Sequence, residues 1–324
     1  MTILNPPTLK PILSIIIINY NLENEIDNCL NSLLQTFRSI DNLSQLFEII
    51  IVDNNSPNKS LFKLEEKYKS DHIHFYYSEK NLGFGKGCNL GVSKAKGDFI
   101  LFLNPDTIVL EDIFSSVISL FNSDNKIGII GPKQQLRKPF FDFSAGFYPN
   151  ILFEIFNLFG LGVFFEGFLV NLLTRFSKKE YLKLHWILGA AIFIRKDLFV
   201  MINGFDKDYF MFFEEVDLCR RVFKSGYKVI YYHELKIHHI GSVSGKRNYF
   251  LYTVRTYASK YLYLTKHYKG LNRIAMVFLL RMQLISQIII WSLLSPLSLD
   301  KSKQKIRSFI YLIKHNLKNE IDIN

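Results

Sequence analysis

The sequence predicts an α/β protein, with a mostly parallel central sheet flanked by helices and a helical C-terminal region. Short runs rich in Ile, Val and Phe alternate with helical patterns over the first third of the chain. Such alternation is typical of parallel strands joined by right-handed crossovers. Small polar motifs directly follow several of these runs. An open α/β sheet binds its ligand just beyond the carboxyl ends of its strands, so these motifs indicate a ligand site.

Composition and charge support this view. A chain of 324 residues that is 48% hydrophobic and 15% aromatic can bury a sizeable core, which excludes a disordered protein. From Lys246 to Lys318 there are 14 Lys or Arg residues and one acid, Asp300, so this stretch carries +13 in a chain of net charge +11. A basic region of this kind suits an anionic membrane surface or a nucleic acid.

The N-terminal apolar run and the cysteines indicate the compartment in which the protein works. Ile12–Ile18 is too short to span a bilayer and has no small-residue cleavage site after it, so we expect it to be the first buried strand. Cys29, Cys88 and Cys219 lie far apart without CxxC spacing. We therefore expect three buried thiols in a reducing compartment, not a disulfide framework or a zinc site.

The first third divides into regular units. We expect strands near 13–19, 47–52, 73–77 and 98–103, and helices near 24–38, 58–69 and 84–96. Asn55-Ser56-Pro57 is a good helix start, because Ser caps free N–H groups and Pro suits the first turn.

The middle of the chain is less regular. We expect a helix near 111–123, a strand at 127–130 closed by Gly131-Pro132, a strand over 186–195, a helix over 214–224 ended by Gly226, a strand at 229–232 and a loop over 238–244. The segment 139–176 is crowded with Phe, Leu and Gly and is too interrupted for a simple spanning helix. It is either a helical insertion packed on the core or a surface that faces lipid or a lipid-linked substrate.

Beyond residue 248 the chain is expected to be helical. The stretch 271–298 is strongly apolar, yet Pro296, its serines and its glutamines favour a helix lying in the membrane plane over a spanning one. A Lys-rich amphipathic tail follows. We therefore expect two regions. The first covers residues 1–247 and consists of two halves, at about 12–110 and 111–247. The second is a basic membrane-associating region over 248–324.

Two motifs can bind a nucleotide. Asp53 follows an apolar strand, where its carboxylate can accept a hydrogen bond from a pyrimidine N3–H, although Asp at this place is also a common helix N-cap. The glycine-rich turn 81–89 leads into a helix and could offer N–H groups to a diphosphate. It only partly matches a dinucleotide fingerprint, because Cys88 stands at the last glycine position and the turn follows the third strand.

Three later motifs carry carboxylates or histidines. Asp106, in Asn104-Pro105-Asp106, can hold a divalent cation on a diphosphate, or simply sit in a turn. Glu214-Glu215-Val216-Asp217 opens a helix, where the dipole stabilises acids and a rigid base can stand. Asp217 lies on the Glu214 face, where it could orient Glu214 or a basic partner such as Arg220 or Arg221. Of His238 and His239 only one can face a site in extended backbone.

In this order, from Ser14 to about Lys246, the motifs resemble glycosyltransferase family 2, which has the Rossmann-like GT-A fold. The similarity is greatest to its bacterial rhamnosyltransferase-like branch, which builds cell-surface polysaccharides. Two positions depart from the family pattern. Asn104 stands where the metal motif usually begins with Asp, and Glu215 replaces the usual Asp base, so Glu214 and Glu215 both remain candidates.

The resemblance implies an inverting, metal-dependent hexosyltransferase. It implies Glu215, Glu214 and Asp217 as catalytic residues, and Asp106 and His239 as ligands of Mg²⁺ or Mn²⁺. The nucleotide-sugar site would comprise Asn19, Tyr20, Asn21, Asp53, Asn55, Asn81, Gly83, Asn89, Asn104 and Gly189.

The same resemblance implies the partners. The donor would be a dTDP- or UDP-sugar, with rhamnose as the sugar that the branch suggests, and the acceptor a saccharide or lipid-linked saccharide. The enzyme would work on an anionic membrane, peripheral or monotopic at the cytoplasmic face of the inner membrane, and would bind no nucleic acid. The rival classes are an NAD-dependent oxidoreductase, a nucleic-acid-binding protein and a catalytically silent sugar-nucleotide-binding or scaffold protein.

Overall fold

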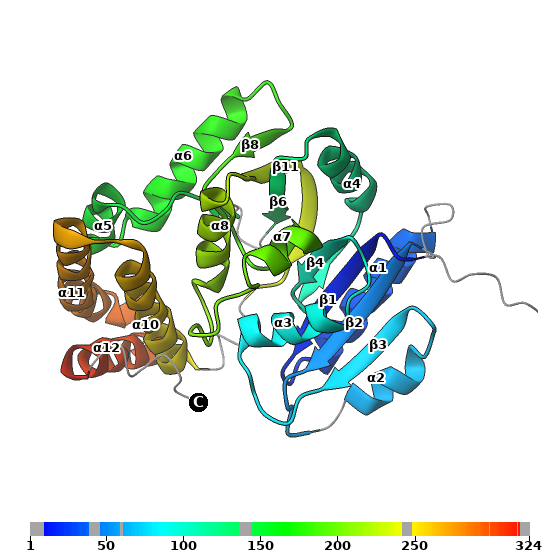
Figure 1. Cartoon of the computed structure of the whole chain (residues 1–324). Coiled ribbons are helices and arrows are strands. Elements are labelled where there is room, and N and C mark those ends of the chain that lie inside the picture. Colours follow the sequence, from blue (N-terminus) through cyan, green and yellow to red (C-terminus); the bar gives the residue numbers. More distant parts are fainter. Residues whose placement is uncertain are drawn as a thin grey trace, which may run out of the picture.

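The computed structural model describes residues 10–38, 46–58, 61–135, 144–241, 248–297, 299–315 and 317 (Figure 1). The first half contains β1 (Leu13–Asn19), α1 (Glu23–Arg38), β2 (Phe47–Asp53), α2 (Leu61–Lys67), β3 (Ile73–Tyr77), α3 (Phe84–Lys94), β4 (Phe99–Leu103), β5 (Thr107–Ile108), α4 (Phe114–Ser123) and β6 (Ile127–Gln135). The second half contains β7 (Ala145–Gly146), α5 (Ile151–Leu158), α6 (Gly162–Phe176), β8 (Tyr181–Lys183), β9 (Trp186–Ile187), β10 (Ala191–Arg195), α7 (Lys196–Met201), α8 (Glu214–Lys224), β11 (Lys228–His239), α10 (Tyr249–His267), α11 (Gly270–Leu293), the 3₁₀ turn η3 (Ser295–Leu297) and α12 (Leu299–Lys314).

The central sheet is mixed but mostly parallel, as predicted. Its strand order is β3-β2-β1-β4-β10-β6-β11-β5, with β8 paired to β11. The strands from β3 to β4 pair in parallel, β10 runs antiparallel to both of its neighbours, and β11 is parallel to β6. Alternate side chains of β1 enter two different cores: Ile15 and Ile17 pack on one face, Ile16 and Ile18 on the other. Both faces are therefore covered, which explains the unbroken apolar runs of these strands.

Two strands are longer than predicted. β6 does not close at Gly131-Pro132 but continues to Gln135. Pro132 is tolerated because β10 pairs with β6 only at Ile129 and Ile130, and the β6–β11 register shifts just after Pro132. β11 likewise runs past the shift to His239, so 238–239 is strand and not loop.

Two other predictions need correction. The expected strand over 186–195 is split into β9 and β10, because the chain turns at Gly189. The helix expected from residue 58 begins at Leu61, and the Ser56 hydroxyl bonds instead to Asn19 and Asp53. Of the insertion 139–176, residues 139–143 lie outside the described residues, and the rest forms β7, α5 and α6.

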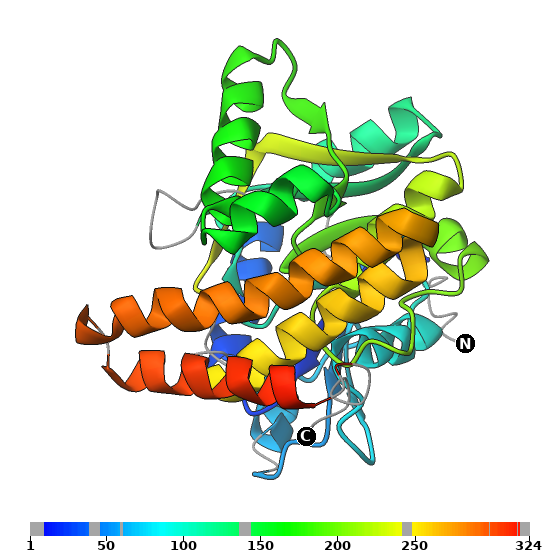
Figure 2. The ribbon, with the colours of Figure 1, turned by 90° about the vertical axis from the view of Figure 1, so that its left-hand side faces the viewer.

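The helical C-terminal region is confirmed, and it packs on the rest of the protein. Figure 2 shows α10, α11 and α12 running side by side. Their core includes Val254, Tyr263 and Met276, and it is continuous with Tyr209 and Val216 around the start of α8. α10 therefore helps to support the start of α8. The boundary expected at 247/248 falls at the edge of the undescribed segment 242–247 and stays a prediction.

One described helix, α11, is long and apolar enough to cross a membrane, with a mean hydropathy of 1.8 over its most apolar window. The protein buries 28% of that window. A core helix of a soluble protein can be as apolar, so the direction in which its apolar side chains point matters more than its composition.

Candidate active site

The first part of the site lies at the tips of β1 and β2. These strands pair in register with Asn19 opposite Asp53. The Asp53 carboxylate is buried and accepts hydrogen bonds from Asn19 Nδ2 at 2.7 Å and from Ser56 Oγ at 2.6 Å through Oδ1. Its Oδ2 accepts from the Ser56 N–H at 3.0 Å. The hydrogen bonds of Asp53 are those of a capping residue. Its position at the tip of β2 is the one expected of a carboxylate that binds a base.

The neighbouring tip residues are held in an open loop. Tyr20 is 45% exposed and Asn55 is exposed. Asn21 and Asn55 both adopt left-handed backbone, with φ of 56° and 64°, a conformation that Asn tolerates well. The Asn21 N–H donates to Ser56 Oγ at 3.0 Å, and Asn21 Oδ1 is buried without a hydrogen-bond partner among the described residues.

The glycine-rich turn is occupied by internal contacts. Three successive N–H groups are used: Leu82 donates to Asn54 Oδ1, Gly83 to Asn81 Oδ1, and Phe84 to the Phe210 carbonyl. A diphosphate cradle made by these groups is therefore not supported. Gly83 has φ of +76°, and a Cβ there would come within 2.2 Å of the Phe210 oxygen, so this position requires glycine.

Asn54 and Asn89 position loops, a role that the sequence did not reveal for Asn54. Asn54 Nδ2 donates to Asn81 Oδ1 and to the Gly83 carbonyl, each at 3.0 Å, and fastens the turn to the end of β2. The Asn89 amide exchanges two hydrogen bonds with the Phe205 backbone. The turn thereby holds the loop that leads to α8.

The extension of β11 brings the two predicted metal ligands together. β5 begins directly after Asp106, and β11 pairs with it with His239 opposite Thr107. The His239 Nε2 consequently lies 3.1 Å from Asp106 Oδ1, and both side chains are buried. Asn104 lies just before them, and its N–H donates to the Ala190 carbonyl at 2.9 Å. This bond joins the predicted metal strand to the turn that contains Gly189.

The acidic helix α8 begins after a strained turn. Phe212 and Phe213 both have left-handed backbone, with φ of 71° and 64°. Consecutive residues of this kind are costly for bulky side chains and must be held by their surroundings. Phe212 packs on Tyr252, Phe213 packs on Tyr263, and the Ser259 hydroxyl donates to the Met211 carbonyl. All three supports come from α10.

This turn sends the two adjacent acids in different directions. Glu214 lies against α3: a Cβ at Gly85 would be 3.8 Å from Glu214 Cβ, and the Glu214 charge acts on the Cys88 thiol. Glu215 faces Gly189, where a Cβ would be 3.9 Å from the Glu215 Cβ and Cγ. Of the two acids, Glu215 is therefore the one that borders the Gly189 turn.

Both acids have raised pKa values. Burial raises the pKa of Glu215 to about 7, against the opposing effect of the N–H groups at the helix start. Burial and the neighbouring Glu215 charge hold the pKa of Glu214 well above its usual range. The Oε2 atoms of both are buried without a hydrogen-bond partner among the described residues. Unpaired carboxylates with raised pKa values are typical of general bases.

Among the described residues, Asp217 binds basic partners and not Glu214, the other group that it was expected to orient. It accepts from Arg221 Nε at 2.7 Å and lies 2.6 Å from His267 Nε2 of α10. These partners lower the pKa of the Asp217 carboxyl against the opposing effect of burial. Arg221 in turn donates to the carbonyls of Ile202 and Gly204. Asp217 therefore fixes α8 to α10 and to the preceding loop.

Further residues beside the site come from α10. Tyr252 lies close enough for the Glu215 charge to add to the burial that raises the Tyr252 pKa. Arg255 lies 4.8 Å from the Phe210 ring centre and within electrostatic reach of Tyr20. The only sequence signal for these residues was the aromatic and basic character of the helix, which did not say what the helix contacts.

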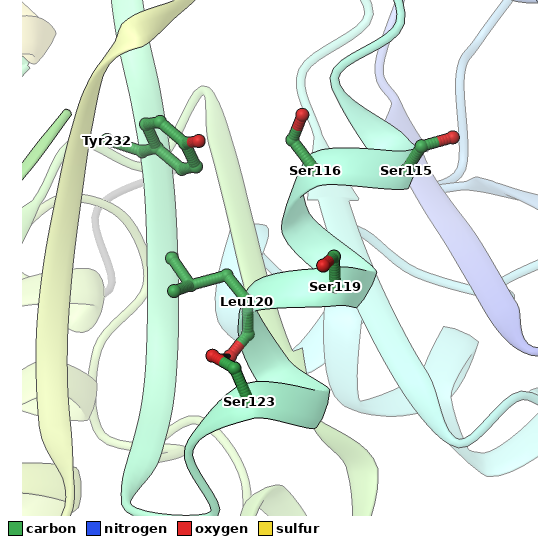
Figure 3. Close-up of a pocket in the computed structure, with 6 residues that line it drawn as sticks. All are labelled: Ser115, Ser116, Ser119, Leu120, Ser123 and Tyr232. Atoms are coloured by element: carbon green, nitrogen blue, oxygen red, sulfur yellow. Dashed lines mark hydrogen bonds between the residues drawn. The ribbon is translucent and has the colours of Figure 1, made fainter.

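A separate hollow of about 420 Å³ lies between α4 and β11 and contains none of the predicted site residues. It is lined by Ser115, Ser116, Ser119, Leu120, Ser123 and Tyr232 (Figure 3). This lining contains no carboxylate or histidine.

Comparison with protein families bears on the choice between the classes. Residues 14–157 match the model of glycosyl transferase family 2. This part of the chain is therefore similar to a family 2 glycosyltransferase domain. It is 27% identical over 198 residues to the rhamnosyltransferase WbbL of Escherichia coli (strain K12), covering 56% of this chain and 69% of that protein. It is 22% identical over 295 residues to the N-acetylglucosaminyl-diphospho-decaprenol L-rhamnosyltransferase of Mycobacterium tuberculosis (strain H37Rv), covering 84% and 90%. The resemblance to the rhamnosyltransferase-like branch is confirmed.

Solved structures confirm the GT-A fold. The mannosyltransferase PcManGT of Pyrobaculum calidifontis, solved with GDP-Man and Mn²⁺, superposes with a TM-score of 0.59 at 12% identity, covering 98% of this chain and 89% of its own. S. aureus TarS 1-349 in complex with UDP-GlcNAc superposes with a TM-score of 0.53 at 15% identity, covering 95% and 83%. At these identities the likeness concerns the fold alone.

The donor set of Asp106 and His239 fits a divalent cation that is shared with a substrate. Among the residues described here, no group of three or more His, Cys, Asp or Glu side chains gathers as a metal site. Mg²⁺ is commonly bound by one or two protein carboxylates together with substrate phosphates. The buried Nδ1 of His239 has no hydrogen-bond partner among the described residues. Two protein ligands completed by a diphosphate are consistent with this arrangement.

Proposed function

We propose that the protein is an inverting glycosyltransferase that moves a sugar from a nucleotide-diphosphate donor to a lipid-linked saccharide in cell-surface polysaccharide synthesis. The observation that carries the proposal is the Glu215 carboxyl beside Gly189, which has a pKa of about 7 and whose Oε2 is buried without a hydrogen-bond partner among the described residues. Rhamnose is the sugar we favour, because two relatives are named as rhamnosyltransferases. The donor base we favour is thymine or uracil, which can donate its N3–H to the Asp53 carboxylate.

In the proposed reaction the donor lies across the strand tips, with its base at Asp53 and its diphosphate near Asp106 and His239. These two residues would hold Mg²⁺ or Mn²⁺, which stabilises the charge of the leaving nucleoside diphosphate. The Glu215 carboxylate accepts the proton of the acceptor hydroxyl as its oxygen attacks the anomeric carbon. The bond to the diphosphate oxygen breaks on the opposite face, so a single displacement inverts the anomeric centre.

Replacement of the two acids one at a time tests this assignment. Glu215→Gln removes the base while keeping the size of the side chain, so we expect kcat to fall by about 10²–10⁴-fold with little change in donor KM. Glu214→Gln should retain most activity, because Glu214 lies against α3. A Glu215→Gln enzyme with full activity would remove Glu215 from this role, and a dead Glu214→Gln enzyme that still binds the donor would assign the base to Glu214.

We also propose that the enzyme lies on an anionic membrane, with α11 in the plane of the membrane. The core-facing side of α11 carries Met276, Leu280 and Gln283, all buried. Its opposite side exposes large apolar residues, which are Leu271, Ile274, Phe278, Ile285, Ile289 and Leu293. An outward apolar face is unusual for a soluble protein and suits contact with lipid.

The Phe-rich insertion extends the same surface. α5 packs on α11, and the Gln283 and Gln287 amides of α11 donate to the Asn157 carbonyl of α5. The exposed apolar side chains of α5, α6 and the link between them include Leu152, Phe159, Phe164, Phe168 and Phe176. This arrangement combines both earlier interpretations of the insertion, because one side packs on the protein and the other is free to face lipid.

A further inference from the structure

The helix α12 places two lysines where its buried side chains point. Phe309 and Leu312 are buried against α10 and α11. Counting back by one and two turns along the same face gives Lys305 and Lys301. Neither ammonium group has an ion pair with a carboxylate among the described residues. The same face of α12 therefore carries two cations in its N-terminal half and core residues in its C-terminal half.

Both lysines meet the same group of aromatic rings. Lys301 Nζ lies 5.3 Å from the ring centre of Tyr249 and 5.2 Å from that of Trp291. Lys305 Nζ lies 5.3 Å from Tyr252 and 5.8 Å from Trp291. We call these five residues the Lys–aromatic cluster. It joins α10, the end of α11 and the start of α12, three helices that lie together in Figure 2.

The cations of this cluster are in an unfavourable setting. Like charges four residues apart on a helix repel each other, and both ammonium groups converge on one indole. Burial, with the Lys301 charge as a second cause, lowers the pKa of Lys305 to about 8. Contacts with aromatic faces offset part of this cost. A bound anion would offset the remainder.

The cluster adjoins the candidate base. The Tyr252 ring lies 4.8 Å from the ring of Phe212, which is three residues before Glu215, and the Glu215 charge acts on the Tyr252 hydroxyl. Among the described residues, none of the contacts that define the cluster involves the predicted metal ligands Asp106 and His239. A molecule with an anion bound here would lie near Glu215.

We propose that Lys301 and Lys305 bind the phosphate or diphosphate group of a lipid-linked acceptor, with Trp291 and the two tyrosines packed around it. This inference rests on the proposed function and specifies its acceptor. The acceptor sugar would present its hydroxyl to Glu215, its phosphate group would meet the lysines, and its lipid chain would follow the exposed apolar face of α11. Lysine is a common ligand of phosphate groups.

A binding experiment without any donor tests the cluster. Trp186→Phe leaves Trp291 as the sole indole, since the chain has two tryptophans. In this background farnesyl diphosphate should change the Trp291 fluorescence saturably, and farnesol should bind at least about tenfold more weakly. Lys301→Gln with Lys305→Gln should raise the Kd for farnesyl diphosphate by about tenfold or more. Lys303→Gln, an exposed lysine of the same helix, is the matched control and should leave it unchanged.

The outcomes separate the proposal from its alternatives. Equal affinity for farnesol and farnesyl diphosphate, or a Kd that the double variant leaves unchanged, would mean that the lysines only stack on the rings. If the double variant loses binding to phosphatidylglycerol vesicles but keeps its affinity for farnesyl diphosphate, the anion is a membrane headgroup and the acceptor assignment is wrong. If Trp186→Phe does not fold, ³¹P line broadening of farnesyl diphosphate with the natural chain and the lysine variants gives the same comparison.

A kinetic comparison then links the cluster to catalysis. The double variant should raise KM for a prenyl-diphosphate-linked saccharide about tenfold, while KM for the same saccharide on a neutral octyl aglycone stays the same. An equal change for both acceptors would contradict a phosphate contact. Absence of transfer by the natural chain would instead count against the proposed function, and the fluorescence titration would still decide the anion site.

Discussion

At the scale of residues, the site depends on how two neighbouring glutamates differ. The motif predicted that one of Glu214 and Glu215 is a base but not which one, because the two adjoin at the same helix end. The left-handed backbone of Phe212 and Phe213 decides their directions. Such a conformation is set by packing on α10, and the local sequence does not encode it. The Asp53 and Asp106 positions needed only a strand followed by an acid and could be predicted.

The Glu215 pKa predicts how activity depends on pH. A base must be ionised to accept a proton, so kcat/KM should fall about tenfold per pH unit below an apparent pKa near 7. The measurement is the initial rate from pH 5 to 9 at low acceptor concentration, with enzyme stability checked at each pH. A rate that is flat down to pH 5 would mean that Glu215 titrates as an ordinary carboxyl or is not the base.

The same carboxyl predicts a change in stability. Its pKa is raised from 4.5 in a model peptide to about 7 in the folded protein, so its ionisation destabilises the fold increasingly between these two pH values. Glu215→Gln should therefore raise Tm at pH 8, by roughly 2 to 4 °C for each kcal/mol relieved, and have little effect near pH 4.5. Calorimetry at both pH values checks this, with the exposed Glu66→Gln as control. A lower Tm at pH 8 would contradict the burial of an unpaired charge.

At the scale of elements, the predicted strands and helices were mostly right, and the errors have a common cause. β11 was predicted to end at Tyr232 because its apolar run ends there, yet it continues through a register shift to pair with β5. Pairing with β5, a two-residue strand far away in the chain, leaves no signal in the sequence of β11 itself. This extension is nevertheless what brings His239 to Asp106, so an error in the bounds of a strand was also an error in the geometry of the predicted metal site.

The contact between α5 and α10 predicts a large effect on stability. Lys260 Nζ lies 2.6 Å from Glu154 Oε2 and 3.1 Å from Gln283 Oε1, and all three side chains are buried. Lys260→Met would leave the Glu154 charge buried without its cation, so we expect a loss of about 3–5 kcal/mol in the free energy of unfolding.

Urea unfolding of three variants measures this effect. Adding Glu154→Leu to Lys260→Met should restore most of the lost stability, because the uncompensated charge is removed. Lys10→Met provides the contrast, since its ion pair with Asp98 is 63% exposed on each side and should contribute under about 1 kcal/mol. If the buried and exposed variants unfold at the same urea concentration, Lys260 does not hold the insertion to α10.

At the scale of the whole molecule, the helical region joins the candidate active site to the proposed membrane surface. The sequence predicted a helical basic region, because its composition is uniform, but not that α10 supports the start of α8. Contacts between residues so far apart in the chain have no signature in a single sequence. Met276, Leu280 and Leu284 of α11 belong to the same core as Val216 of α8. Deletion of α11 and α12 would therefore disturb the site as well as the proposed membrane contact.

Membrane binding is better tested by changing only the outward face of α11. Phe278, Ile285 and Ile289 are 58%, 46% and 60% exposed, so their replacement by Ser leaves the core intact while removing apolar area from the proposed lipid contact. We expect co-sedimentation with phosphatidylglycerol vesicles to fall at least about tenfold, with donor hydrolysis unchanged. Val200→Ser with Met201→Ser removes similarly exposed apolar side chains from α7 and should have no effect on sedimentation. If the α11 variant still sediments with the vesicles as the natural chain does, the apolar face must be covered by something other than lipid, and the acceptor would have to reach Glu215 from solution.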